Sequence, residues 1–202
     1  MPSAAGPEWV IREDANVAVI LALALRQLIG VRWPDELPPL RGLPSNEVDR
    51  DEVDQARVER QWREYWAMSV EPQAHHASGP LELVDGFETY IALPVEGFDD
   101  LRAAIAPHTS AVAFARAAHD RYAGDAPGRS GVSYRAYAGA IAQHEREVGR
   151  RAHAFELNVQ ILPLTQRGLW WIGSLTIAVT DGLRSDVVAF DAAIHPIIAE
   201  LA

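Results

Sequence analysis

The residues best suited to chemistry in this sequence are its histidines. His108, His119 and His144 fall on apolar stripes whose members are three and four residues apart, as on one face of a helix. Imidazole is a common metal ligand and an acid–base group that titrates near neutral pH. Three imidazoles and a water form an accepted metal site, so the candidate metal ligands are His108, His144 and His195.

The spacing of these histidines limits which of them can act together. His108 and His119 are about 16 Å apart along a straight helix, so they cannot share one ion. If the two stripes pack as antiparallel helices, His108 faces the level of His144, and His119 faces the level of Tyr134 and Tyr137. The motifs HExxH and HxxxH are absent. A hydrogen-bonded core or interface histidine is the more common role, so no metal site and no cofactor is favoured.

A second candidate for chemistry is segment 180–186, TDGLRSD, where an expected strand ends and a helix begins. Asp181 suits the turn, and Ser185 suits the N-cap of the helix that follows. Free backbone N–H groups there, together with Arg184, could hold a carboxylate or a phosphate. A turn followed by a cap explains the segment equally well without a ligand. The candidate catalytic residues are therefore His119, His144, Asp181 and Arg184.

Two further stretches resemble functional motifs and are better explained as loops. EPQAHHASGP, residues 71–80, holds the adjacent pair His75 and His76. Adjacent side chains of an extended segment point to opposite sides, which makes them poor partners for one ion and favours a solvated loop. GDAPGRS, residues 124–130, is one residue too short for a P-loop and has Arg129 where a lysine is needed.

The composition excludes several classes of function. Cysteine is absent, which rules out disulfides, thiolate nucleophiles and cysteine-ligated metals. All 18 basic residues are arginine, a bacterial-like composition that also excludes Schiff-base lysine chemistry. The net charge of −10 disfavours nucleic acid as a partner. The longest apolar run, Val17–Leu25, is too short to span a membrane, so we expect a cytoplasmic protein with no membrane partner.

The first half of the chain is expected to supply two helices and a hairpin. Asp14 is a plausible N-cap for a helix that reaches about Gly30 and is apolar on all sides, as core helices are. Residues 33–45 form a proline-rich connecting loop, and a second helix runs from Ser45 to about Met68. Residues 69–80 are a further loop. Asp85-Gly86 between two strand-like runs predicts a two-residue hairpin turn.

The second half is expected to supply two antiparallel helices, a second hairpin and a last helix. Pro107 should split the first helical stripe. The second hairpin joins 155–162, which alternates apolar and polar residues, to 169–179. The strand at 169–179 is apolar on both faces, which indicates a central strand or a covered face. The last helix begins after Ser185 and runs toward Leu201.

These elements predict an α+β fold: helices on a small antiparallel sheet made of two hairpins, in the order α-α-ββ-α-α-ββ-α. We expect a single domain over 1–202, with residues 1–13 frayed. Because the aromatic residues Trp62, Tyr65 and Trp66 and the apolar strand would leave an exposed patch, we expect a non-enzymatic interaction protein that acts as a homodimer, with an unknown protein partner as a further possibility. The alternatives are a small metal-dependent or acid–base enzyme with a His-lined site between helices, and an acidic inhibitor or immunity-type protein.

Overall fold

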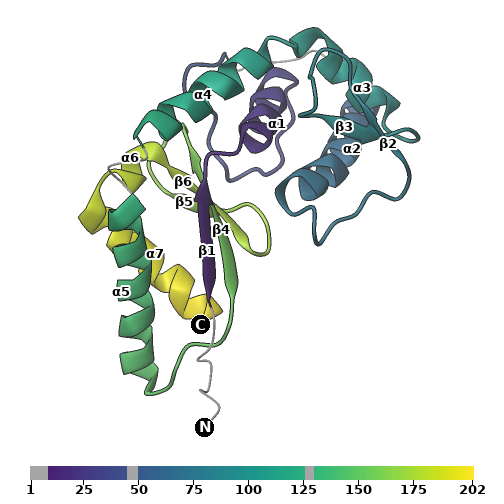
Figure 1. Cartoon of the computed structure of the whole chain (residues 1–202). Helices are drawn as coiled ribbons and strands as arrows, with labels where there is room; N and C mark the ends of the chain where they lie inside the picture. The colour runs from purple at the N-terminus through teal and green to yellow at the C-terminus, as the bar shows by residue number, and fades with distance from the viewer. Residues whose placement is uncertain (1–8, 45–49, 126–129) are drawn as a thin grey trace.

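The computed structural model describes residues 9–44, 50–125 and 130–202 and shows a mixed α/β fold (Figure 1). A four-stranded sheet has the order β1-β4-β6-β5. Its strands are β1 (Val10–Asp14), β4 (Glu156–Leu162), β6 (Thr176–Thr180) and β5 (Leu169–Trp171). The first three are parallel to one another, and only β5 is antiparallel to its neighbour β6.

The predicted antiparallel sheet of two hairpins is therefore wrong in its pairing. Residues 10–13, expected to be frayed, lie in β1 and pair with β4, which comes some 140 residues later. Strand β6 is inserted between β4 and β5, and all five of its residues are buried. A strand that is parallel to a neighbour and covered on both faces reads as a continuous apolar run, which is the pattern that predicted a central strand.

The expected hairpin around Asp85-Gly86 exists, but it stands apart from the main sheet and its turn is longer. Strands β2 (Leu81–Leu83) and β3 (Ala92–Pro94) form a separate antiparallel pair joined by residues 84–91. Within that connection the Phe87 N–H donates to the Val84 carbonyl at 3.2 Å, and Gly86 has φ +82°. A positive φ at the third position is the geometry of a type II turn, not of the predicted two-residue hairpin turn.

Helix α1 (Val17–Leu28) is the central core helix that its sequence predicts. Every residue from Val19 to Leu28 is buried. Its N-cap is Asn16, whose side chain accepts a hydrogen bond from the Ala18 N–H at 2.8 Å, rather than the predicted Asp14. Asp14 is instead the last residue of β1, so the helix begins two residues later than expected.

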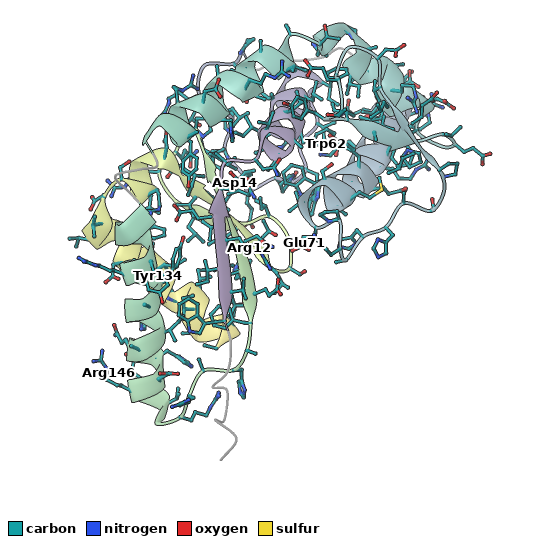
Figure 2. All side chains as sticks on the ribbon, viewed as in Figure 1. Arg12, Asp14, Trp62, Glu71, Tyr134 and Arg146 are labelled. Atoms are coloured by element: carbon teal, nitrogen blue, oxygen red, sulfur yellow. The ribbon has the colours of Figure 1, made fainter. Side chains whose placement is uncertain are left out.

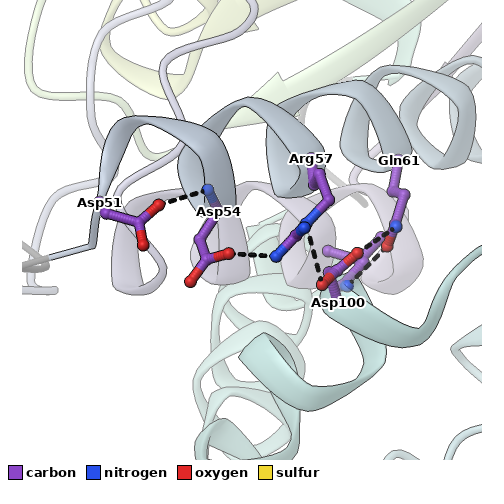
Figure 3. A network of polar contacts seen from close by, with 6 residues as sticks. Asp51, Asp54, Arg57, Gln61 and Asp100 are labelled. Atoms are coloured by element: carbon purple, nitrogen blue, oxygen red, sulfur yellow. Dashed lines mark hydrogen bonds and ion pairs between the residues drawn. The ribbon is translucent and has the colours of Figure 1, made fainter.

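A polar network fixes helix α2 (Glu52–Val70) against α3 (Asp99–Ile105), as Figure 3 shows. Asp51 caps α2 by accepting from the Asp54 N–H at 2.8 Å, and Arg57 pairs with Asp54 and, at 3.5 Å, with Asp100. The Gln61 amide donates to the other Asp100 oxygen at 2.9 Å. The network sets the position of the N-terminal half of α2.

The remaining helices pack in a different arrangement from the one expected. The first stripe is split at Pro107, as predicted, into α3, the 3-10 turn η1 (Ala106–His108) and α4 (Ala111–Asp125). However, α4 packs against α1, and α5 (Ser130–Val148) packs against α7 (Val187–Leu201), instead of forming one antiparallel pair. The segment that joins α4 to α5, with most of GDAPGRS, lies outside the described residues. The short helix α6 (Asp181–Arg184) precedes α7, whose N-cap is Asp186 and not Ser185.

Two hydrophobic clusters result. The first gathers α1, α2, α3 and one side of α4, and the second lies between the sheet and the helix pair α5 and α7, which Figure 1 shows side by side. Trp62, Tyr65 and Trp66 are buried in the first cluster, so the aromatic residues expected at an exposed patch are covered within the chain. No helix in the described ranges is long and apolar enough to cross a membrane.

Candidate functional site

A cavity of about 660 Å3 lies where the two clusters meet. Three segments form its wall: the proline-rich loop at 33–37, the last two turns of α2 with Glu71 and His75 directly after them, and the hairpin of β5 and β6. Four of the six tryptophans of the chain line it, namely Trp33, Trp66, Trp170 and Trp171. A concave, mostly apolar cavity with a few polar groups is the usual form of a small-molecule site.

Indole N–H groups hold the three segments together. The Trp66 N–H donates to the Ile172 carbonyl at 3.1 Å and so connects α2 to the β5–β6 hairpin. The Trp62 N–H donates to the Trp33 carbonyl at 2.9 Å and connects α2 to the proline-rich loop. The rings of Trp62 and Trp66 stack with centroids 6.2 Å apart. Both of these rings are buried, whereas Trp33 keeps 37% of its surface exposed, so the wall is rigid at its base and open at Trp33.

Glu71 forms the polar end of the cavity, next to the turn before β6 (Figure 2). Its carboxylate accepts hydrogen bonds from the Leu175 N–H at 2.6 Å, the Ser174 hydroxyl at 2.8 Å and the Thr176 hydroxyl at 3.2 Å. Burial acts to raise the pKa of Glu71, but the hydrogen bonds from backbone and hydroxyl donors outweigh it and leave the pKa below its ordinary value. Glu71 is therefore ionised at neutral pH.

The other charged groups of the cavity lie around Trp33. The Arg63 guanidinium lies over the Trp33 ring, 4.5 Å from its centroid. Asp35 and Glu36 follow Trp33 in the loop and are exposed. The cavity therefore combines aromatic faces with charges of both signs.

The histidine pair of the 69–80 loop is exposed, as predicted, but it is not remote from this site. His75 lines the cavity, and its Nε2 atom is 4.0 Å from a Glu71 carboxylate oxygen. His76 lines a neighbouring cavity of about 360 Å3 that shares Ala67 and His75 with the first. The two rings do not converge on a third ligand: the described residues contain no group of three or more His, Asp or Glu side chains that could hold a metal ion.

A buried polar network lies beyond the carboxyl ends of β1 and β6. Glu13, the fourth residue of β1, accepts from the Arg184 guanidinium at 2.8 Å and from the hydroxyls of Tyr137 at 2.8 Å and Tyr122 at 3.2 Å. Arg184 is 2% exposed and also lies over the Phe190 ring, 4.8 Å from its centroid. The network joins β1, α4, α5 and α6, so it connects elements of both clusters.

Burial and the negative charge of Glu13 both raise the pKa of Tyr122 and of Tyr137. Burial first, and then the negative charge of Glu13, raise the pKa of Tyr122 to about 12. The same two causes raise the pKa of the more deeply buried Tyr137 further. Both phenols therefore stay protonated at neutral pH and act as donors to Glu13, which favours a structural role over proton transfer.

The structure distributes the predicted site residues over several places. Arg184 enters the Glu13 network, whereas Asp181 lies at the surface and pairs with Arg41. His119 is within 2.8 Å of the Ala15 carbonyl through Nδ1, as a hydrogen-bonded structural histidine would be. His108 ends η1, and burial together with the positive charge of Arg50 lowers its pKa.

His144 and His195 are the one predicted pair that lies on packed helices, α5 and α7. The Nε2 atom of each is buried and has no hydrogen-bond partner among the residues that the structure describes. The His195 Nε2 atom is 3.9 Å from a carboxylate oxygen of Glu147, which lies one turn from His144 on α5. The structure does not bring His108 to this pair.

Sequence reasoning missed the cavity and most of the network. The tryptophans that line the cavity come from three distant segments, and each by itself is typical of a core residue. Glu13 was missed because it falls in a segment expected to be frayed. The chain matches no known protein family, no curated protein and no solved structure.

Proposed function

We propose that the protein is a non-enzymatic binding protein and that the tryptophan-lined cavity is its binding site. The observation that carries the proposal is the convergence of Trp33, Trp66, Trp170 and Trp171 on one cavity of about 660 Å3. Such a volume fits a small molecule or one large side chain of a partner. Aromatic walls supply large contact areas without loss of much rotamer freedom, as in many binding sites.

Filling the cavity tests this proposal. Ala67 lines the cavity on α2, and Ala56 is exposed on the same helix and does not line it. Ala67→Phe should abolish binding of a small-molecule panel, measured by the shift of tryptophan emission and of Tm, while Ala56→Phe should leave it intact. Val70→Phe is a second filling variant, in case Ala67→Phe does not fold. Binding that survives both filling variants, or a wild-type protein that binds no member of the panel, would contradict the proposal.

We also propose that the protein is cytoplasmic and acts as a homodimer, without nucleic acid as a partner. The net charge of −10 supports the last point. The dimer is supported by scattered exposed apolar residues such as Val188 and Tyr134. The aromatic residues of α2 do not support it, because they are buried. Light scattering at micromolar concentration decides between a mass near 22.2 kDa and twice that value.

The two alternative functions have less support. A His-lined metal enzyme needs His108, His144 and His195 to converge, and no group of three potential ligands is present among the described residues. An acidic inhibitor rests on net charge alone. Metal analysis of the purified protein tests the first, and pulldown with a basic partner tests the second.

A further inference from the structure

The charges around the tryptophan-lined cavity are predominantly negative. Asp35, Glu36 and Glu71 contribute three carboxylates against the single guanidinium of Arg63, which leaves a net charge of −2 when His75 is neutral. Asp35 and Glu36 form no hydrogen bond or ion pair with any residue that the structure describes. The buried Arg26 guanidinium interacts electrostatically with Asp35, so Glu36 is the exposed carboxylate whose charge is available to a ligand.

The C-terminal end of α2 adds to this negative potential. Ala67 and Val70 of its last turns and the C-cap residue Glu71 line the cavity, so the carbonyl end of the helix lies beside it. The helix dipole places partial negative charge at that end and favours a cation there.

Arg63 indicates which chemical group the aromatic wall accepts. Its side chain is exposed and forms no ion pair with a described carboxylate, yet the guanidinium lies 4.5 Å from the centre of the Trp33 ring. A cation over the face of tryptophan is stabilised by the negative face of the ring, and quaternary ammonium groups are bound in this way in aromatic cavities. Arg63 therefore occupies the position that a cationic ligand group would take.

We infer that the ligand of this cavity carries a positively charged alkylated ammonium or guanidinium group, which binds over Trp33 in place of Arg63. The inference rests on the proposed function and adds the chemical class of the ligand. Because Arg63 is exposed and has no carboxylate partner in the part of the chain that the structure describes, its side chain can move into solvent when the ligand enters.

Three probes of similar shape test whether charge determines binding to the cavity. Choline, its neutral carbon analogue 3,3-dimethyl-1-butanol and the anionic 3,3-dimethylbutanoate share the branched end group and differ in charge. Titration calorimetry and tryptophan emission at low ionic strength should show choline binding more tightly than either analogue by about tenfold or more, and less so as salt is added.

Two pairs of variants locate the effect. Arg63→Gln should tighten choline binding by about threefold, because it removes a competing cation, whereas Arg60→Gln on the same helix should not. Asp35→Asn with Glu36→Gln should weaken choline binding and leave the neutral analogue unchanged. The matched control, Glu96→Gln with Glu200→Gln, changes the net charge equally at exposed positions outside the cavity.

The outcomes distinguish this inference from the proposed function. If choline and the neutral analogue bind equally, if the anion binds best, or if only uncharged members of the wider panel bind, the inference is overturned and the binding site stands. If no probe and no panel member binds, the proposed function itself is overturned.

Discussion

Glu13 and Glu71 are both carboxylates with little exposure, 14% and 9% of their side chains, and their surroundings differ. Glu13 is compensated by the formal charge of Arg184, with two phenol donors in addition. Glu71 is held by one backbone N–H and two hydroxyls, and the His75 Nε2 atom lies 4.0 Å from its carboxylate. The first arrangement neutralises a charge inside the protein, and the second keeps a charge at the wall of a cavity.

This difference indicates that Glu13 stabilises the fold, whereas Glu71 can also act on a ligand. A buried ion pair has no net charge to offer a ligand, although the Arg184 Nη2 atom has no hydrogen-bond partner among the described residues. Removing one partner of the pair leaves an uncompensated charge. A carboxylate satisfied by neutral dipoles retains its net charge, so it still contributes to the potential of the cavity.

The largest effect is expected from breaking the buried ion pair. Arg184→Met should lower the free energy of unfolding by about 3–5 kcal/mol, because the Glu13 carboxylate loses its counter-ion away from solvent. Urea unfolding followed by tryptophan fluorescence measures this. Arg167→Met is the control, since Arg167 pairs with Asp186 at the surface at 2.6 Å, and its effect should be much smaller. Equal losses of unfolding free energy in the two variants would show that the Glu13–Arg184 pair does not stabilise the fold in this way.

Replacing Glu71 should have a smaller effect on stability. Glu71→Gln puts an amide N–H₂ group where an acceptor is needed, so one of the three donors loses its partner at a cost of about 1–3 kcal/mol. Glu64→Gln, at an exposed position of the same helix, should leave the free energy of unfolding almost unchanged. A Glu71→Gln variant as stable as Glu64→Gln would contradict the hydrogen-bonded geometry.

Glu71 also predicts a pH dependence that Glu71→Gln should reduce. Hydrogen bonds from backbone and hydroxyl donors hold the pKa of Glu71 in the folded protein below its ordinary value. The stability that this shift supplies is present above the unfolded pKa and is lost as the pH falls through the folded pKa. The free energy of unfolding can be measured between about pH 6 and about pH 3, a range that brackets the region of about 4 where glutamate titrates. Over this range it should fall more for the wild type than for the variant.

Substitution of two glycines by alanine tests the two arrangements through steric contact and leaves the charges unchanged. A Cβ atom at Gly173 would meet the Glu71 carboxyl carbon at 2.6 Å, whereas one at Gly182, two residues before Arg184, would meet nothing within 4 Å. Gly173→Ala should therefore lower the free energy of unfolding by about 1–3 kcal/mol and change the ligand affinity of the cavity. Gly182→Ala should be neutral or slightly stabilising in both measurements.

The smallest effect is expected from single phenol hydroxyls. Tyr137→Phe removes the 2.8 Å hydrogen bond to Glu13 and should cost about 1 kcal/mol. Because the folded pKa of Tyr137 is raised above the unfolded value of about 10, its contribution is present below pH 10 and is lost as the pH rises toward the folded pKa. Tyr137→Phe should consequently lose less stability than wild type between neutral pH and alkaline pH. An identical alkaline profile would place Tyr137 outside the network.

Local patterns predicted the elements whose surroundings are decided by nearby residues. The helix that contains the apolar run Val17–Leu25 is buried from Val19 to Leu28, and Pro107 splits the third helical stretch, because both effects act within a few residues. Strand β1 was missed because Arg12, Glu13 and Asp14 give it no apolar alternation, and its partner is far along the chain. Parallel pairing leaves no turn signal in the sequence.

In the candidate site, too, the sequence predicted only features that nearby residues determine. Arg184 was identified from its position between a strand and a helix, and it does lie in a buried polar site. Its partner could not be identified, since nothing in the sequence relates residue 184 to residue 13. The cavity depends on Trp33, Trp66 and Trp170 meeting across three segments, which only the tertiary arrangement determines.

The pairing of β1 with β4 has a consequence for the order of events during synthesis. Because Val10 pairs with Glu156, the sheet cannot assemble on the ribosome until more than 140 further residues have emerged. Meanwhile the apolar helix α1, made directly after β1, lacks several of its eventual neighbours. The nascent chain should therefore depend on chaperones through most of its translation and then fold slowly, as proteins with long-range strand pairing do.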